Sequence, residues 1–223
     1  MGKDLRGKEL GVGITQRKDG LIKTCSTDPT IASGDFILLA PSHQKDNILD
    51  SCLEPVIEGL KSTGYKVILR PHPQYIRRYP DKWKRISAQY SSDPQVITES
   101  DFSSNTSIYQ AALVVTDWSN IGYEYSFSTL RPVMFVNTPM KVINPDYKEI
   151  GVVPIDLSLR SEIGIEVTGK SADEVAEAAE KLLKTKCFSP EQISEARDRS
   201  LFNVGKSDEV GGKYILSRLS QKK

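Results

Sequence analysis

The sequence predicts an α/β protein with a doubly wound parallel sheet and a helical C-terminal tail. From Phe36 onward, short apolar runs rich in β-branched residues alternate with longer segments in which apolar residues recur at helical spacing. This alternation is typical of βαβ units around a buried parallel sheet. Polar side chains cluster directly after several of the apolar runs, where open parallel sheets bind their ligands.

Composition limits the classes of protein to which the chain can belong. The 223 residues carry 30 basic and 29 acidic side chains, a net charge of +1, so no bulk charge favours nucleic acid as a partner. At 38% hydrophobic residues, the chain is expected to bury a core as one large domain. Cys25, Cys52 and Cys187 lack a CxxC spacing, and no apolar run approaches the ~20 residues of a membrane span. We therefore expect a soluble, cytoplasmic protein with reduced thiols.

Residues 1–35 are rich in polar and turn-forming types and are expected to be a linker or lead-in segment. Residues 36–223 are expected to form the folded domain with its helical tail. The five predicted strands share short, buried-type apolar runs and cover residues 36–40, 66–69, 95–98, 113–116 and 132–136.

Helices are predicted between these strands. Between the first two strands, an apolar face from Leu49 to Leu60 predicts a helix that ends at Gly64, with a kink or a late start imposed by Pro55. Further crossover helices are expected over residues 81–91, 105–112 and 119–129. Two more helices, over residues 190–200 and 208–219, are expected to close the chain.

The region after the fifth strand predicts one more short strand and one strong helix. Residues 152–155 have the composition of a short strand. Ser171, with Glu174 three residues later, predicts a capping box at the start of a helix with an apolar stripe from Val175 to Leu183.

Both histidines of the chain lie at the predicted ligand edge. Ser42 and His43 follow the first strand, and Arg70 and His72 follow the second. Loop residues at this edge often contribute to function, which makes all four candidates for a binding or catalytic site. A histidine between two prolines also suits a purely structural role, so shaping the loop remains an alternative for His72.

The turn after the fourth strand predicts an anion site. Asp117, Ser119 and Asn120 follow a buried strand and precede a helix, whose first amides lack intrahelical partners and whose dipole is positive at that end. Glu124, about one turn further on, is placed to reach ribose hydroxyls if phosphates bind the helix start. The alternatives are that Asp117 or Ser119 is a plain N-cap and that Glu124 is an ordinary solvated glutamate.

A second phosphate motif lies further along the chain. Residues 164–171 match the P-loop pattern GxxxxGK[ST], which includes Lys170 and Ser171. The preceding segment is polar where a P-loop requires a buried strand, and Ile165 and Val167 resemble a short strand themselves. We therefore favour the turn at Ser119 over this motif. The chain contains no DxD, GxSxG or HExxH pattern, which predicts metal-independent chemistry without a cofactor.

Three motifs in order, RPHP at residues 70–73, TDWSNIGYE at 116–124 and RPVMFV at 131–136, resemble the CDP-glycerol glycerophosphotransferase family of teichoic acid and related surface-polymer synthesis. The similarity extends from Phe36 to Leu219. It implies the Rossmann-like, nucleotide-binding C-terminal half of a GT-B fold, which binds the CDP part of the donor. In this chain Trp118 and Asn120 stand where the family tends to have Tyr and Ser, and Ser42-His43-Gln44 replaces a Thr-aromatic-Arg stretch.

Carried over by position, the resemblance implies that His72, with Arg70 beside it, faces the pyrophosphate and assists the leaving phosphate. Ser119 and Asn120 would hold phosphate oxygens, while Asp117 shapes the turn. Glu124 would contact the ribose or base, and Ser42 and His43 would lie near the donor phosphates.

The implied partners are CDP-glycerol or a related nucleotide donor and a polymer acceptor at the membrane surface. The acceptor half, which in the family carries the catalytic base and the membrane contacts, would be a further domain or a partner chain. Two other functions remain open. One is a GT-B domain for a sugar nucleotide, as in glycosyltransferases or UDP-sugar 2-epimerases, and the other is a non-catalytic nucleotide-binding module.

Overall fold

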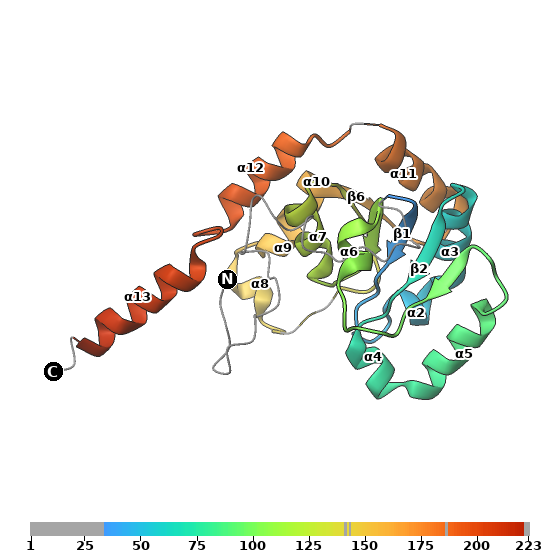
Figure 1. Cartoon of the computed structure of the whole chain (residues 1–223), viewed down its shortest axis with the longest axis horizontal. Helices are drawn as coiled ribbons and strands as arrows, with labels where there is room; N and C mark the ends of the chain where they lie inside the picture. Colours follow the sequence, from blue (N-terminus) through green and yellow to red (C-terminus); the bar gives the residue numbers. More distant parts are fainter. Residues whose placement is uncertain (1–33, 141, 143, 186, 221–223) are drawn as a thin grey trace.

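The protein folds around a six-stranded, fully parallel sheet with helices on both faces (Figure 1). The computed structural model describes residues 34–140, 142, 144–185 and 187–220. The strand order is β3-β2-β1-β4-β5-β6, the doubly wound order of Rossmann-like folds and of a GT-B half. The expected lead-in segment, residues 1–35, lies almost entirely outside the described residues.

The strands are short, and most are buried along their whole length. They comprise β1 (Phe36–Leu39), β2 (Lys66–Leu69), β3 (Val96–Thr98), β4 (Leu113–Thr116), β5 (Val133–Val136) and β6 (Gly164–Val167). In the central pairs, Ile37 is in register with Val67 on one side and with Leu113 on the other. Successive side chains of each strand therefore enter the two opposite cores.

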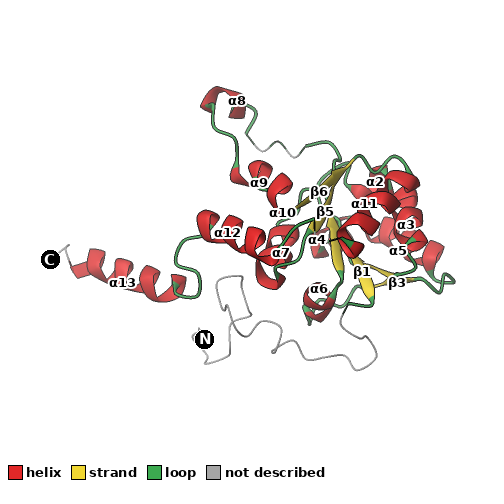
Figure 2. Ribbon diagram, turned by 90° about the horizontal axis from the view of Figure 1, so that it is seen from above, coloured by secondary structure: helices red, strands yellow, loops and turns green. Residues whose placement is uncertain are grey.

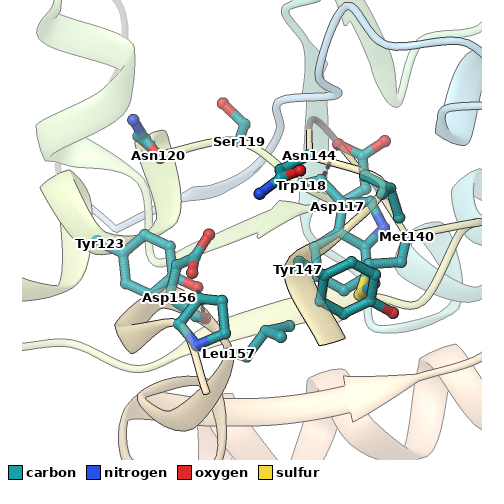
Figure 3. A pocket seen from close by; sticks show the side chains of 12 residues that line it. Asp117, Trp118, Ser119, Asn120, Tyr123, Met140, Asn144, Tyr147, Asp156 and Leu157 are labelled. Atoms are coloured by element: carbon teal, nitrogen blue, oxygen red, sulfur yellow. Dashed lines mark hydrogen bonds between the residues drawn. The ribbon is translucent and has the colours of Figure 1, made fainter. Parts of the chain in front are cut away.

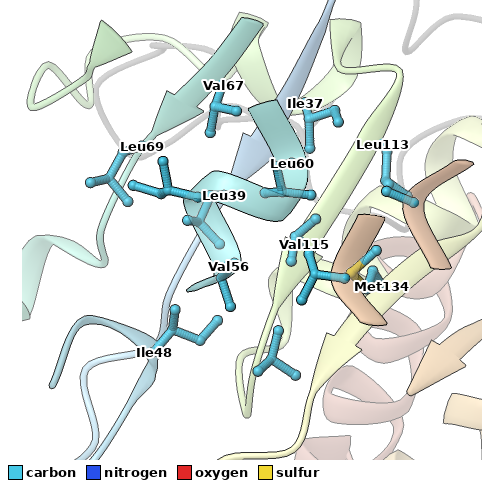
Figure 4. Close-up of a cluster of buried hydrophobic side chains, with 14 of the residues drawn as sticks. Ile37, Leu39, Ile48, Val56, Leu60, Val67, Leu69, Leu113, Val115 and Met134 are labelled. Carbon is cyan, nitrogen blue, oxygen red and sulfur yellow. The ribbon is translucent and has the colours of Figure 1, made fainter. Parts of the chain in front are cut away.

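One core lies beneath α3 (Leu53–Ser62), α5 (Pro80–Tyr90) and α11 (Ala172–Lys184). Ile37 and Leu39 of β1 meet Val56 and Leu60 of α3 in this core (Figure 4). The opposite core lies beneath α6 (Thr106–Gln110), α7 (Ile121–Thr129), α10 (Arg160–Ile163) and α12 (Pro190–Ser200). Viewed from above, the two groups of helices lie on opposite sides of the sheet (Figure 2).

The five predicted strands are confirmed to within one residue at their ends. The strand expected at residues 152–155 is wrong: residues 152–154 have no regular structure, and Ile155 begins the short helix α9 (Ile155–Ser158). The sixth strand is β6, inside the P-loop match, where Ile165 and Val167 are strand residues as expected. Val152 and Val153 are about two-thirds exposed, so their β-branched side chains gain nothing from the sheet.

The helix predicted between β1 and β2 is divided in two. The division occurs at Cys52, whose extended φ of −152° separates α2 (Ile48–Ser51) from α3. Pro55 stands in the first turn of α3, where its missing amide has no intrahelical partner to lose. The late start expected from Pro55 is therefore what the structure has.

The capping box expected at Ser171 is wrong, although Ser171 is the N-cap of α11. The Ser171 side chain makes no capping hydrogen bond there. The Glu174 carboxylate instead accepts hydrogen bonds from the amide (2.8 Å) and hydroxyl (2.6 Å) of Thr168, in the turn before the helix. Burial alone would raise the pKa of Glu174, but the hydrogen bonds from Thr168 and from the Gly169 amide together outweigh it and lower the pKa.

The C-terminal helices match their predicted positions. The helix α12 starts with a full capping box between Ser189 and Gln192, and α13 (Ser207–Ser220) extends away from the sheet (Figure 1). In the described part of the chain, no helix is both long and apolar enough to cross a membrane.

The helices α3 and α11 approach each other closely at Gly59. A Cβ added at Gly59 would lie 2.4 Å from the carbonyl oxygen of Ala172 and 2.7 Å from Cβ of Val175. Both obstacles are backbone or near-backbone atoms that cannot move aside. Gly59→Ala is expected to lower the free energy of unfolding by about 2 kcal/mol, as measured by urea denaturation.

Gly212 in α13 supplies the matched control, because a Cβ added there meets nothing within 4 Å. Gly212→Ala is expected to leave stability unchanged or to raise it by up to about 1 kcal/mol through helix propensity. Equal destabilisation of the two variants would contradict close packing between α3 and α11.

Candidate functional site

The candidate site lies at the carboxyl ends of β1, β2 and β4. The strand order changes direction between β1 and β4, so the loops that follow these strands turn to opposite sides and leave a crevice. Seven of the eight candidate residues predicted from the sequence, all except Glu124, belong to the segments that immediately follow these strands.

Two cavities flank this crevice and meet at Ser119. The larger, of about 390 Å³, extends from the β4–α7 turn to the segment that follows β5 (Figure 3). Its lining includes Trp118, Asn120, Tyr123 and Tyr147.

The smaller cavity, of about 290 Å³, lies on the side of β2. It is mostly apolar, and its lining includes His72, Phe102, Asn105 and Ile121 together with Ser119. A ligand that spans both cavities would therefore pass over the start of α7.

The start of α7 presents small polar side chains and backbone amides to this junction. Asn120 is the N-cap residue, and the Ile121 amide makes only a long hydrogen bond of 3.4 Å to the Ser119 hydroxyl. The first amides of a helix have no intrahelical acceptors, and the helix dipole is positive at this end. The turn therefore suits an anion bound over Ser119 and Asn120.

Asp117 joins the two loops that border the crevice. Its carboxylate accepts hydrogen bonds from the amides of Ser42 (2.8 Å), Ile48 (3.1 Å) and Trp118 (2.8 Å). The residue is 1% exposed, so these bonds replace the water that an aspartate normally binds. The loop after β1 and the turn after β4 are thus held together by one side chain.

His72 has a defined proton position because it caps a helix. Its Nδ1 accepts a hydrogen bond of 3.1 Å from the Gln74 amide at the start of α4 (Pro73–Arg78). The neutral imidazole therefore carries its proton on Nε2, which is then a donor. The His43 ring lies against it, with ring centroids 4.4 Å apart, so the two histidines of the chain form one pair.

The Arg70 guanidinium is directed into the loop that follows β3. It forms an ion pair with Glu99 (3.1 Å) and donates hydrogen bonds to the Ser107 hydroxyl and the Ser104 carbonyl, each at 2.9 Å. It also lies 5.2 Å from the centre of the Phe102 ring. These contacts hold Arg70 in the wall of the smaller cavity. The expectation was instead that its guanidinium faces a pyrophosphate.

Ser42 and Glu124 are the remaining candidates. Ser42 is buried, and among the described residues its hydroxyl has no hydrogen-bond partner. Glu124 is half-buried on α7, one turn beyond Asn120 and Ile121, which line the two cavities. Burial raises the pKa of the Glu124 carboxyl. Its carboxylate is therefore held in a place where ionisation costs free energy.

Arg160 is a major component of the site that the sequence analysis missed. It is 2% exposed and lies beneath the β4–α7 turn, where it donates hydrogen bonds to the Asp117 carbonyl (2.6 Å) and the Asn137 side chain (2.7 Å). Its guanidinium lies 4.0 Å from the centre of the Trp118 ring. The surrounding segment is polar in sequence, and nothing in its pattern distinguishes a buried arginine from an exposed one.

The aromatic wall of the larger cavity was also missed. Tyr123 donates a hydrogen bond to the Asp156 carbonyl, and burial raises its pKa to about 12. Met140 and Tyr147 complete the wall from the segment that follows β5. Aromatic residues in such loops carry no periodic signal from which a cavity can be predicted.

Comparison with solved structures supports the fold. The chain is similar to a putative UDP-N-acetylglucosamine 2-epimerase from Listeria monocytogenes, with a TM-score of 0.54, 14% identity and coverage of 93% of this chain and 50% of that one. A UDP-GlcNAc 2-epimerase from Methanocaldococcus jannaschii gives a TM-score of 0.51 at 15% identity, with 83% of this chain and 47% of that one covered. The S. aureus MnaA-UDP structure gives 0.50 at 16% identity, with 82% and 47% covered.

These structures place the chain in the architecture of one Rossmann-like half of a GT-B fold. The chain spans about half the length of the enzymes that it matches. No family model matches the sequence, and no curated protein matches it.

The three hydrogen bonds that the Asp117 carboxylate accepts predict a large loss of stability when the side chain is replaced by an amide of nearly the same shape. In Asp117→Asn, one carboxylate oxygen becomes an amide donor that faces a backbone donor. The variant is expected to lose about 2 kcal/mol of unfolding free energy, as measured by urea denaturation. Asp146→Asn is the control, because Asp146 is exposed and makes no capping hydrogen bond, and it is expected to change stability by less than about 0.5 kcal/mol. Similar small effects in both variants would show that Asp117 does not hold the two loops.

The raised pKa of Glu124 predicts a pH-dependent gain in stability when its charge is removed. The cost of ionising a buried carboxyl is absent below the ordinary pKa of 4.5 and grows as the pH rises through the folded-state pKa. Glu124→Gln is therefore expected to be more stable than the wild type at pH 7 and about equally stable at pH 4. Thermal unfolding across this pH range measures the difference. A variant that is less stable at pH 7 would contradict a desolvated carboxylate.

Proposed function

We propose that the chain is the donor-binding half of a GT-B enzyme that uses a nucleoside diphosphate donor, with CDP-glycerol as the donor and glycerol phosphate as the transferred group. The observation that carries the proposal is the meeting of two cavities at Ser119, directly over the start of α7 and at the switch point of the sheet. An elongated ligand with a charged centre fits this arrangement better than a compact one.

The diphosphate is assigned to the junction between the cavities. The amides and small side chains at Ser119 and Asn120 would bind phosphate oxygens. The buried Arg160, which also pairs with Glu166 at 3.2 Å, would hold the backbone of this turn in place through its hydrogen bond to the Asp117 carbonyl. His72 shares the smaller cavity with Ser119, and its Nε2 proton makes it a hydrogen-bond donor to the same group.

The nucleoside is assigned to the smaller, mostly apolar cavity. A planar base would lie between Phe102 and Ile121, where the Asn105 side chain would form hydrogen bonds with its polar edge. Glu124 lies one turn along α7 from Ile121, and its carboxylate would accept hydrogen bonds from the ribose hydroxyls. Burial raises the pKa of Glu124, so its ionised form costs stability. Residues that cost stability in this way are expected at binding sites, where ligand binding requires them.

The proposed reaction is a phosphoryl-group transfer. An acceptor hydroxyl attacks the β-phosphorus of CDP-glycerol, the bond from that phosphorus to the bridging oxygen breaks, and CMP leaves. Negative charge develops on the leaving phosphate, where His72 donates a hydrogen bond or a proton. Stabilisation of this charge is the main contribution that the present chain would make to the rate.

The acceptor and the base that deprotonates it are assigned to another domain or partner chain. The chain spans about half of the GT-B enzymes that it matches, and each cavity lies at the open edge of the sheet. A second domain that holds the polymer acceptor would cover this edge.

Calorimetric titration with CDP, UDP and ATP, each with EDTA or with Mg²⁺, tests the proposal. We expect binding of CDP in EDTA that is tighter than that of UDP or ATP. His72→Asn is expected to weaken it about tenfold, because asparagine can cap α4 but cannot supply the Nε2 donor.

Retained stability of His72→Asn in urea denaturation is the control for folding, since the cap is preserved. Preference for UDP would instead favour a sugar-nucleotide enzyme. Binding of ATP only with Mg²⁺ would favour the P-loop match at Lys170, and either result would overturn the assignment of CDP.

A further inference from the structure

A cluster of basic side chains lies on α4 and α5, next to the candidate site. Its members are exposed, and we call them the basic edge: Arg77, Arg78, Lys82, Lys84 and Arg85. The helix α4 begins directly after His72, so the basic edge continues from the ligand edge of the sheet. Figure 1 shows α4 and α5 together at one corner of the molecule, away from α12 and α13.

The charge of the basic edge contrasts with that of the rest of the chain. Residues 77–85 hold five basic side chains and one acidic side chain, Asp81. Removing these from the totals of 30 and 29 leaves 25 basic and 28 acidic residues, so the remaining sequence is net negative. A positive surface on an otherwise slightly acidic protein suits an anionic partner.

The arrangement of these charges costs stability in the isolated protein. Lys82 and Lys84 lie near the start of α5, where the helix dipole disfavours cations. Lys82 pairs with Asp50 at 2.7 Å, but Arg85 lies close enough to Lys82 to oppose its positive charge. Among the described residues, Lys82 is the member of the basic edge that forms an ion pair. The cluster therefore has no evident structural role that requires five cations.

An exposed aromatic residue at the corner favours a membrane surface as the partner. Tyr79, between α4 and α5, is 37% exposed, and its ring lies 5.0 Å from the Lys82 ammonium and 5.2 Å from the Tyr75 ring. Tyrosine beside lysine and arginine is the combination preferred at the headgroup level of a bilayer. The helices α4 and α5, which carry the five exposed cations, lie at one corner of the molecule, where a flat anionic surface can reach them.

We propose that the basic edge docks the protein on anionic lipid headgroups. Clusters of four to eight basic residues on a protein surface bind acidic membranes, each contributing about fivefold at low salt. Docking through α4 would bring the His72 end of the candidate site close to the headgroups. The inference rests on the charge and exposure of the basic edge and on the position of Tyr79, and it is independent of the proposed donor.

Vesicle co-sedimentation of the full chain tests the proposal, with vesicles of phosphatidylcholine alone and with vesicles that also contain about 30% of the anionic lipid phosphatidylglycerol. We expect binding to the anionic vesicles that falls steeply between 50 and 200 mM salt, about as other surface electrostatic binding does. Arg77→Gln/Arg78→Gln/Lys84→Gln is expected to weaken it about a hundredfold.

The matched control is Lys184→Gln/Lys213→Gln/Arg218→Gln, which removes the same net charge from α11 and α13 and keeps residues 1–35 unchanged. It is expected to bind nearly as well as the wild type. Equal loss in both variants would overturn the proposal in favour of bulk charge. Equal binding to both vesicle types, or binding to inorganic polyphosphate without binding to vesicles, would also overturn it. Vesicle binding and nucleotide titration are separate measurements, so the membrane-docking proposal and the proposed donor can be contradicted independently of each other.

Discussion

The arrangement of the site depends on one buried carboxylate, that of Asp117. In a doubly wound sheet, the loops after the two central strands diverge, and nothing in the sheet itself fixes the distance between them. Asp117 fixes it by accepting amide hydrogen bonds from the loop after β1 and from its own turn after β4. Since an uncompensated buried charge is costly, both loops must adopt the conformations that supply these donors.

The buried Arg160 side chain holds the same turn from the other side and forms its ion pair with Glu166. The Arg160 guanidinium donates to the Asp117 carbonyl and lies 4.0 Å from the Trp118 ring and 4.6 Å from the Phe135 ring. The backbone of the turn is thereby fixed on both sides, and the start of α7 is presented to the crevice in one orientation. Preorganised donors of this kind bind phosphate charge without a further cost of ordering. His72 follows the same principle, because its role as a cap fixes which nitrogen carries the proton.

The sequence was sufficient to predict five of the six strands and the edge of the sheet on which the candidate site lies. Buried parallel strands are continuous apolar runs, so β1, β2, β4 and β5 were evident, and the residues that follow them could be identified. The sequence was not sufficient for contacts between distant segments. That Arg70 pairs with Glu99 and that Arg160 lies under Trp118 depend on tertiary packing, for which these residues have no local pattern. The prediction of a strand at residues 152–155 was wrong for the same reason. The β-branched residues in this segment favour a strand, but the sequence does not show whether a neighbouring strand is present to pair with it.

In the proposed complex, a nucleoside diphosphate places its phosphates over the start of α7, between the two cavities. A crystal structure of the chain with CDP tests this most directly. We expect both phosphates to lie within hydrogen-bonding distance of the amides and side chains at Ser119 and Asn120, with the base in the cavity lined by Phe102 and Ile121. Phosphates bound instead at the turn containing Lys170, or a nucleotide located away from Ser119, would contradict it.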